Sequence, residues 1–159
     1  MQNIQRISPF LWFDNQAEEA AKFYVSIFKN SKVNKVIYYG EAGPGPKGDV
    51  MIVYFELDGQ RFVALNGGTP KFTESISFVV NCTTQQEVDG YWEKLSAEGG
   101  QKIQCGWLKD KYGISWQITP IILIEMLGDP NPKKSQQVFE AMLQMEKIDI
   151  KKIEQAYAQ

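Results

Sequence analysis

Residues 76–95, ISFVVNCTTQQEVDGYWEKL, predict a strand that runs into a capped helix. Ile76 to Val80 is rich in β-branched and aromatic residues, as strands are. Thr84 and Glu87 have the spacing of a capping box, in which a threonine side chain accepts a hydrogen bond from the first turn of a helix. The apolar residues that follow recur at helical spacing: Val88, Tyr91, Trp92 and Leu95. Further strands are predicted at 103–108 and 114–119.

An earlier segment repeats this order. A strand is predicted at 7–13, and Asn15 followed by Glu18 predicts the N-cap of a helix. Strands follow at 33–39, 50–57 and 62–65, with the hairpin signal Asp58-Gly59 between the last two. The simplest explanation is an α+β protein of two βαβββ modules, at about 4–66 and 73–120. A chance likeness between two ordinary α+β segments is the alternative.

A helical extension is predicted at about 121–159. Gly128-Asp129-Pro130-Asn131-Pro132 cannot continue a helix, and two helices are expected after it. In the second of them Ile148 and Ile153 flank an Asp149 cap at the spacing of a hydrophobic staple. This extension either packs on the main sheet or forms a subunit interface or lid.

Composition favours one globular domain over residues 1–159. The chain is 43% hydrophobic, and 17 Lys and Arg against 19 Asp and Glu give a net charge of −2. This balance gives no electrostatic reason to expect nucleic acid as a partner. No apolar stretch reaches the ~20 residues that cross a bilayer, so no membrane partner is expected either.

The chain contains no histidine, which excludes nucleophile pairs and zinc sites that depend on one. Its two cysteines, Cys82 and Cys105, form no CxxC motif, and buried thiols explain them better than a redox pair. The start MQNIQRISPF lacks the apolar stretch of a secretion signal. We therefore predict a cytoplasmic location.

Several stretches resemble the PhnB-like branch of the glyoxalase/bleomycin-resistance/dioxygenase (vicinal oxygen chelate) superfamily, whose members often carry the label 3-demethylubiquinone-9 3-methyltransferase. They are ISPFLWF at 7–13, Phe23-Tyr24 with Ile27-Phe28, the run from Phe62 to Gly68, CGWLKDKYG at 105–113 and Trp116-Gln117. The resemblance implies two βαβββ modules that curl around a cavity, commonly assembled as dimers. It therefore implies a homodimer here.

Metal-using members of that superfamily hold the ion with His, Glu or Gln on inward strand positions. Strand alternation places Ile7, Leu11 and Phe13 on the helix side of the first strand. The cavity side then receives Ser8, Phe10 and Trp12, followed by Phe62, Ala64 and Asn66, then Ser75 and Ser77, and finally Ser115, Gln117 and Thr119. Hydroxyls and amides hold transition metals poorly without anionic or imidazole ligands, so no metal and no cofactor are expected. These polar residues either orient a ligand or are hydrogen-bonded core groups.

The letters G-x-G-x-x-G at 43–48 are better explained as a connecting loop near the cavity mouth than as a phosphate cradle. Pro44 and Pro46 each remove an N–H donor, and a strand rather than a helix follows. The charged turn at 109–111 is expected to be solvated, with Asp110 as a general base the less favoured alternative. No catalytic residue is assigned.

The leading hypothesis is a metal-independent protein that binds an aromatic or amphiphilic small molecule. The predicted ligand-binding residues are Ser8, Phe10, Trp12, Asn66, Ser77, Trp107 and Gln117. One alternative is a transferase of the 3-demethylubiquinone-9 3-methyltransferase type, although the glycine-rich βαβ units of typical methyltransferases are missing. A second alternative is a dimeric interaction protein without a ligand. Whether the chain is an enzyme is left open.

Overall fold

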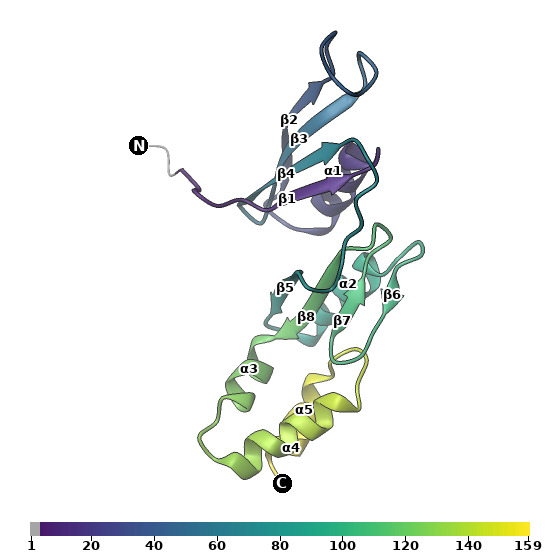
Figure 1. The fold of residues 1–159 in the computed structure, drawn as a ribbon. Helices are drawn as coiled ribbons and strands as arrows, with labels where there is room; N and C mark the ends of the chain where they lie inside the picture. The colour runs from purple at the N-terminus through teal and green to yellow at the C-terminus, as the bar shows by residue number, and fades with distance from the viewer. Residues whose placement is uncertain (1–3) are drawn as a thin grey trace. The chain divides into compact units, whose positions relative to one another are not determined.

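The computed structural model describes residues 4–159 and divides after Lys71 into two compact units. Each unit contains one of the two predicted βαβββ modules, and the second also carries the predicted helical extension (Figure 1). Residues 1–3 lie outside the described residues. They belong to the predicted domain 1–159 and to the stretch used for the cytoplasmic location, and both of these stay predictions.

The first unit is a four-stranded sheet with a helix on one face. Its elements are β1 (Phe10–Phe13), α1 (Ala17–Ile27), β2 (Lys32–Tyr38), β3 (Val50–Leu57) and β4 (Gln60–Asn66), and its strand order is β1-β4-β3-β2. β1 runs parallel to β4, and the other pairs are antiparallel. Asp58 and Gly59 both have positive φ between β3 and β4, which confirms the predicted tight hairpin.

Alanines let α1 lie close to the sheet. Ala17, Ala20 and Ala21 are fully buried beside Tyr24, and they pack against the face of the sheet that carries Phe55. The small alanine side chains on the helix leave room for the large Phe55 side chain on the sheet, so the two surfaces can pack closely.

The second unit repeats this plan. It contains β5 (Ser77–Cys82), α2 (Gln85–Leu95), β6 (Gln101–Lys102), β7 (Trp107–Lys109) and β8 (Ser115–Pro120), in the strand order β5-β8-β7-β6. The predicted capping box is confirmed, since the Thr84 side chain accepts from the backbone nitrogen of Glu87 at 3.2 Å. The Glu87 carboxylate accepts from the nitrogen of Thr83 rather than from that of Thr84.

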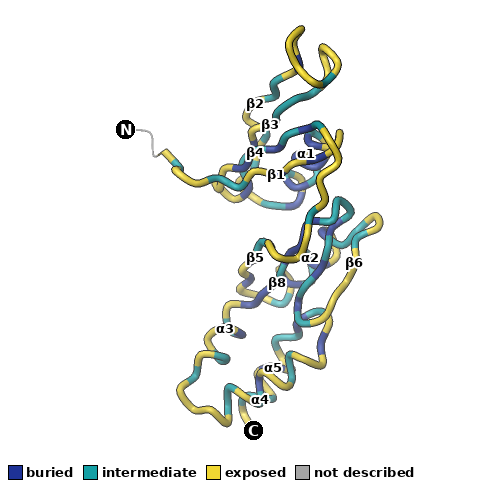
Figure 2. Tube along the Cα trace, viewed as in Figure 1, coloured by how far each residue is buried: buried dark blue, intermediate teal, exposed yellow. Residues whose placement is uncertain are grey.

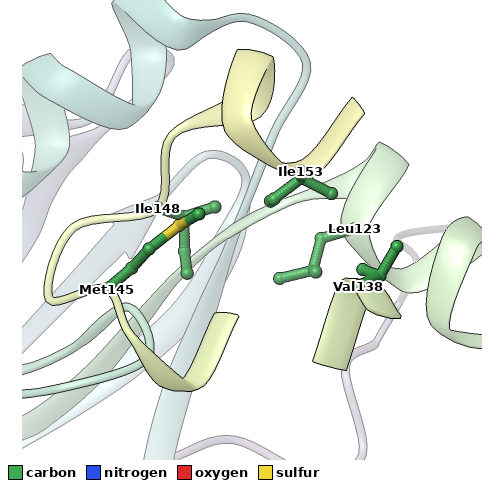
Figure 3. Close-up of a cluster of buried hydrophobic side chains, with 5 residues drawn as sticks. All are labelled: Leu123, Val138, Met145, Ile148 and Ile153. Atoms are coloured by element: carbon green, nitrogen blue, oxygen red, sulfur yellow. The ribbon is translucent and has the colours of Figure 1, made fainter. Parts of the chain in front are cut away.

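The extension consists of α3 (Ile121–Leu127), α4 (Pro132–Leu143) and α5 (Ile150–Tyr157). These helices have a core of their own, built by Leu123, Val138, Met145, Ile148 and Ile153 (Figure 3). The Asp149 cap of α5 is confirmed by a hydrogen bond from the nitrogen of Lys152. The extension is tied to the second module by backbone bonds from Cys105 to Met145 and from Gly106 to Glu146.

Alternation along β1 is confirmed in part. Leu11 and Phe13 are buried, whereas Phe10 and Trp12 are 56% and 48% exposed. By contrast, the loop between β2 and β3 is exposed along most of its length (Figure 2). Ile7 was expected on the helix side and is instead 86% exposed, because β1 begins only at Phe10. Period-two alternation does not extend to residues that precede the strand.

The predicted faces of β4 are wrong. Phe62, Ala64 and Asn66 were expected to face the cavity, but all three are buried and share the helix-covered face with Leu11 and Phe13. The opposite face of β4 carries Val63 and Leu65, in register with Phe10 and Trp12. A shift of one residue in the assumed phase of a strand reverses every side chain on it.

The faces of β5 and β8 are as expected. Ser77, Gln117 and Thr119 share a face with Val79, which is 50% exposed, while Val80 and Cys82 are buried on the other face. Ser75 was placed on this strand but is exposed and precedes it. Strand alternation therefore held for the predicted residues that lie on β5 and β8.

Candidate functional site

A groove of about 910 Å³ lies within the first unit, and we call it the unit-1 groove. The end of β1, the start of α1, the loop between β2 and β3, and the end of β4 meet there. The side chains that matter most in the argument below are Trp12, Asp14, Glu18, Tyr39, Asp49 and Leu65. Its volume is typical of small-molecule sites.

Tyr39 anchors the wall of the groove. Its ring is only 7% exposed, and its hydroxyl donates to the backbone oxygen of Asn66 at 2.6 Å. The loop at 40–49 folds over this ring so closely that a Cβ added at Gly43 or Gly45 would overlap it. Gly43 and Gly45 therefore serve loop packing, and β3 follows the loop as expected.

Trp12 also lines the groove, next to the turn that follows β4. Its indole Nε1 donates to the backbone oxygen of Gly67, which fixes the ring against the Gly67-Gly68 turn. An added Cβ at Gly68 would lie 3.5 Å from Cζ2 of the indole, so the turn passes at contact distance. A large aromatic surface is thus held in place and stays half exposed.

Four carboxylates line the same groove as these aromatic residues. Asp14, Glu18, Glu19 and Asp49 all line the groove, and no lysine or arginine is among the described residues that line it. Glu18 pairs with Lys22 at 2.8 Å one turn along α1. The groove therefore combines an apolar wall with negative charge.

Of the four predicted site residues of the first unit, Trp12 and Asn66 both line the unit-1 groove, whereas Ser8 and Phe10 lie outside its lining. Phe10 and Trp12 lie together on the open sheet face. Ser8 precedes β1, accepts a hydrogen bond from Gln5 at 3.0 Å, and lines a smaller hollow of about 320 Å³ beside Tyr54. Asn66 lines the unit-1 groove, but its side chain is engaged by backbone groups of Ala17 and Val50.

The predicted site residues of the second unit share one sheet face. Gln117 donates from Nε2 to the hydroxyl of Ser77 at 3.0 Å, and Trp107 lies in register with Gln117 on the neighbouring strand. The hydroxyl of Ser115 is buried near them without a hydrogen-bond partner in the described part of the chain. One cavity lined by the residues of both units stays a prediction.

Asp110 was expected in a solvated turn and is 3% exposed. Its Oδ1 accepts from the backbone nitrogens of Tyr112 and Ile114, and its Oδ2 accepts from Trp116 Nε1 at 2.8 Å. The carboxylate holds the turn between β7 and β8 together. Burial among these donors gives it a structural role and does not favour the general-base alternative.

The two cysteines differ in their surroundings. Cys82 is fully buried, and burial together with the charge of Glu87 raises the pKa of its thiol to about 11. Cys105 is partly exposed and has a positive φ of 61°. A thiol with a raised pKa is a poor nucleophile, so Cys82 is a packing residue.

Within residues 4–159 no group of three or more His, Cys, Asp or Glu side chains is arranged to hold a metal ion. None of the helices described there is long and apolar enough to cross a membrane.

The groove carboxylates were not identified as site residues by the sequence analysis. Tyr39 follows β2 directly before the Gly-Pro loop, and its sequence position fits a phenolic donor to a ligand and a packing residue equally well. Asp14 and Asp49 are 35 positions apart in the sequence. Only the folded sheet brings the end of β1 and the start of β3 to the same groove.

Comparisons with known proteins agree with this fold. Residues 5–119 match the family model described as 3-demethylubiquinone-9 3-methyltransferase. A solved PhnB protein from Bacillus cereus, which carries that same description, is 37% identical to this chain with a TM-score of 0.66, covering 73% of this chain and 99% of its own.

More distant structures share the fold alone. A protein from Pseudomonas aeruginosa is 19% identical, covers 74% of this chain and 98% of its own, and has a TM-score of 0.61. The fosfomycin resistance protein FosX from Listeria monocytogenes is 16% identical, covers 81% of this chain and all of its own, and has a TM-score of 0.57. Comparison with curated proteins found no match.

Proposed function

This chain belongs to the 3-demethylubiquinone-9 3-methyltransferase family, a PhnB-like branch of the glyoxalase/bleomycin-resistance superfamily, and from that premise we propose that it binds an aromatic or amphiphilic small molecule without a metal ion. The observation that carries the proposal is the unit-1 groove. Its volume suits a small organic molecule, and Trp12 offers that molecule a fixed aromatic surface.

Neutral polar groups give the proposed ligand its orientation. Ser77 and Gln117 are bonded to each other beside Trp107 on one sheet face, and Ser8 and Asn66 belong to the first unit. The proposed ligand-binding set remains Ser8, Phe10, Trp12, Asn66, Ser77, Trp107 and Gln117. Of the polar members, Asn66 is the least available, because its amide already serves two backbone partners.

Metal independence is part of this proposal, and the chemistry of the seven proposed residues supports it. Their hydroxyls, amides and indoles carry no charge, and the chain contains no histidine to assist them. The carboxylates that line the groove are charged, but within residues 4–159 they form no group of three or more arranged to hold a metal ion. Elemental analysis after purification without chelators tests the point. A stoichiometric transition metal bound to the folded protein would contradict it.

A thermal-shift screen over quinones, drugs and metabolites is the first experiment. Hits are then measured against Trp12→Ala and Gln117→Ala, with Phe139→Ala and Gln136→Ala as controls on the exposed surface of α4. We expect Trp12→Ala to weaken binding at least about tenfold, because a stacked aromatic contact is worth ~1 kcal/mol beyond its buried area. Unchanged affinity in both site variants would count against these residues.

The description of the matching family model favours a second candidate, a methyltransferase that acts on a demethylated quinone. Both modules have the order βαβββ and neither has the glycine-rich parallel βαβ unit that typically binds the cosubstrate. Incubation with S-adenosylmethionine and a demethylated quinone separates the candidates. A methylated product would establish the transferase, and absence of both product and cosubstrate binding would remove it.

We further propose that the protein is a cytoplasmic homodimer. The open face of the first sheet exposes Phe10 and Tyr54, an apolar surface that a second copy would cover. Sedimentation velocity at micromolar concentration measures the association state. A dimer that binds no member of the ligand screen would support the remaining alternative, an interaction protein without a ligand.

A further inference from the structure

We infer that the unit-1 groove selects an organic cation, a molecule with an apolar or aromatic body and a positively charged amine or similar group. This inference rests on the proposed function, because it names the class of ligand that the proposed site accepts.

The charged side chains that line the unit-1 groove are all acidic. Asp14, Glu18, Glu19 and Asp49 line it, and the lining residues of the described chain include no lysine or arginine. Lys22 neutralises Glu18 from the next turn of α1. Lys47, on the loop beside the groove, is engaged by Glu41 and is not a lining residue.

Two of these carboxylates are placed to meet a ligand. Asp14 follows β1 and Asp49 precedes β3, and both side chains are exposed. Their backbone groups hold the groove in shape, since the Asp14 oxygen accepts from Gly67 and the Asp49 oxygen accepts from Tyr39. The side chains are thus carried on backbone that is fixed by hydrogen bonds, which lowers the entropy cost of meeting a ligand.

The aromatic wall fits the same ligand. The hydrogen bond from Trp12 to Gly67 fixes the edge of the indole and leaves the ring half exposed. Indole is the aromatic side chain that attracts cations most strongly over its face. Carboxylates and indole in one groove attract a cation together and repel an anion, so charge decides between ligands with the same apolar body.

Three probes with one naphthalene body test this inference: 1-naphthylmethylamine, which is a cation at pH 7, 1-naphthylmethanol, which is neutral, and 1-naphthoate, which is an anion. Affinities are measured by isothermal titration with the full chain at low ionic strength. We expect the amine to bind about tenfold more tightly than the alcohol, as two partly screened charge pairs allow, and the naphthoate to bind most weakly.

The double variant Asp14→Asn/Asp49→Asn should remove most of the amine's advantage and leave the alcohol's affinity unchanged. The double variant Glu140→Gln/Glu154→Gln makes the same change in net charge on α4 and α5 and should keep the advantage. Retained binding of the alcohol shows that the groove of the first double variant is intact.

The outcomes separate the inference from the proposed function. Equal affinity for amine and alcohol, or an unchanged advantage in Asp14→Asn/Asp49→Asn, would overturn the cation preference alone. Failure of all three probes, together with a screen without hits, would overturn the small-molecule site and the inference with it.

Discussion

The side-chain oxygen Oδ1 of Asn66 lies 2.8 Å from the backbone nitrogen of Ala17 and accepts its hydrogen bond. The last residue of β4 therefore caps the first turn of α1, although 49 positions separate the two residues. The amide of the same side chain donates to the backbone oxygen of Val50 at 3.1 Å, at the start of β3. One buried carboxamide thus joins the helix to two strands beside the unit-1 groove.

Replacing Asn66 by alanine should destabilise the first unit by about 1–3 kcal/mol, because it leaves a buried donor and a buried acceptor without partners. The matched control is Asn15→Ala, since Asn15 stands where the sequence predicts the cap but the N-cap of α1 is Gln16. That control should change stability by less than about 0.5 kcal/mol. Urea unfolding of both variants provides the measurement, and an equal loss in the two would contradict the capping role.

This cap shows where sequence reasoning reaches its limit. The spacing of Asn15 and Glu18 predicts a helix start, and a helix does begin at Ala17, but its N-cap is Gln16 without a side-chain bond. A local pattern locates the helix because the apolar periodicity is local. The atom that satisfies Ala17 comes from β4, and no short-range spacing reveals it.

The faces of strands show the same limit. On β5 and β8 the alternation was correct for Ser77, Gln117 and Thr119 and failed for Ser75, which precedes the strand. On β4 the assignment was reversed although Phe62, Ala64 and Asn66 all lie on the strand, because alternation gives the period of a strand and not which face meets the core. The two-module fold and its extension were thus predictable from sequence, and the unit-1 groove was not.

Asp110 provides a test of the charged turn in the second unit. Replacing it by alanine removes acceptors from two backbone amides and from the Trp116 indole, so we expect a loss of about 2–4 kcal/mol. Glu98→Gln removes only a surface ion pair with Lys111 and should cost at most about 1 kcal/mol. Thermal unfolding of both variants measures the difference. A folded, fully stable Asp110→Ala protein would restore the general-base alternative.

Cys82 should make the protein less stable at alkaline pH. Burial raises the pKa of its thiol to about 11, so the folded state favours the neutral thiol, while the unfolded chain ionises it near the ordinary value of about 8.5. The stabilisation is complete below the unfolded pKa and is lost as the pH rises toward the folded one. Denaturant unfolding between about pH 8 and 11 should reveal this loss.

The variant Cys82→Ala, which has no thiol to ionise, should flatten that decline by an amount on the order of 2 kcal/mol. Cys105→Ser changes the partly exposed thiol and serves as the control, which should keep the alkaline decline of the parent protein. A decline that persists in Cys82→Ala would assign it to other groups.

Substitutions at two glycines of the stretch CGWLKDKYG can distinguish the cost of backbone strain from the cost of a steric clash. Gly106 and Gly113 both have positive φ, at 80° and 88°. A Cβ on Gly106 would lie 2.8 Å from the backbone oxygen of Ile118 and 3.1 Å from the Cγ1 atom of Ile148, whereas a Cβ on Gly113 would meet nothing within 4 Å.

Gly113→Ala should therefore cost only the left-handed backbone strain of about 1–2 kcal/mol. Gly106→Ala adds a clash with backbone that cannot move freely, since the Gly106 nitrogen donates to Glu146 and its oxygen accepts from Ile118. We expect it to cost at least about 2 kcal/mol more than Gly113→Ala and to loosen the contact between β7 and the helical extension. Urea unfolding compares the two costs, and hydrogen exchange at the backbone amide of position 106, in the parent protein and in Gly106→Ala, follows the contact with Glu146. Equal losses of unfolding free energy in the two variants, together with unchanged hydrogen exchange at position 106, would contradict close packing of the helical extension against this turn.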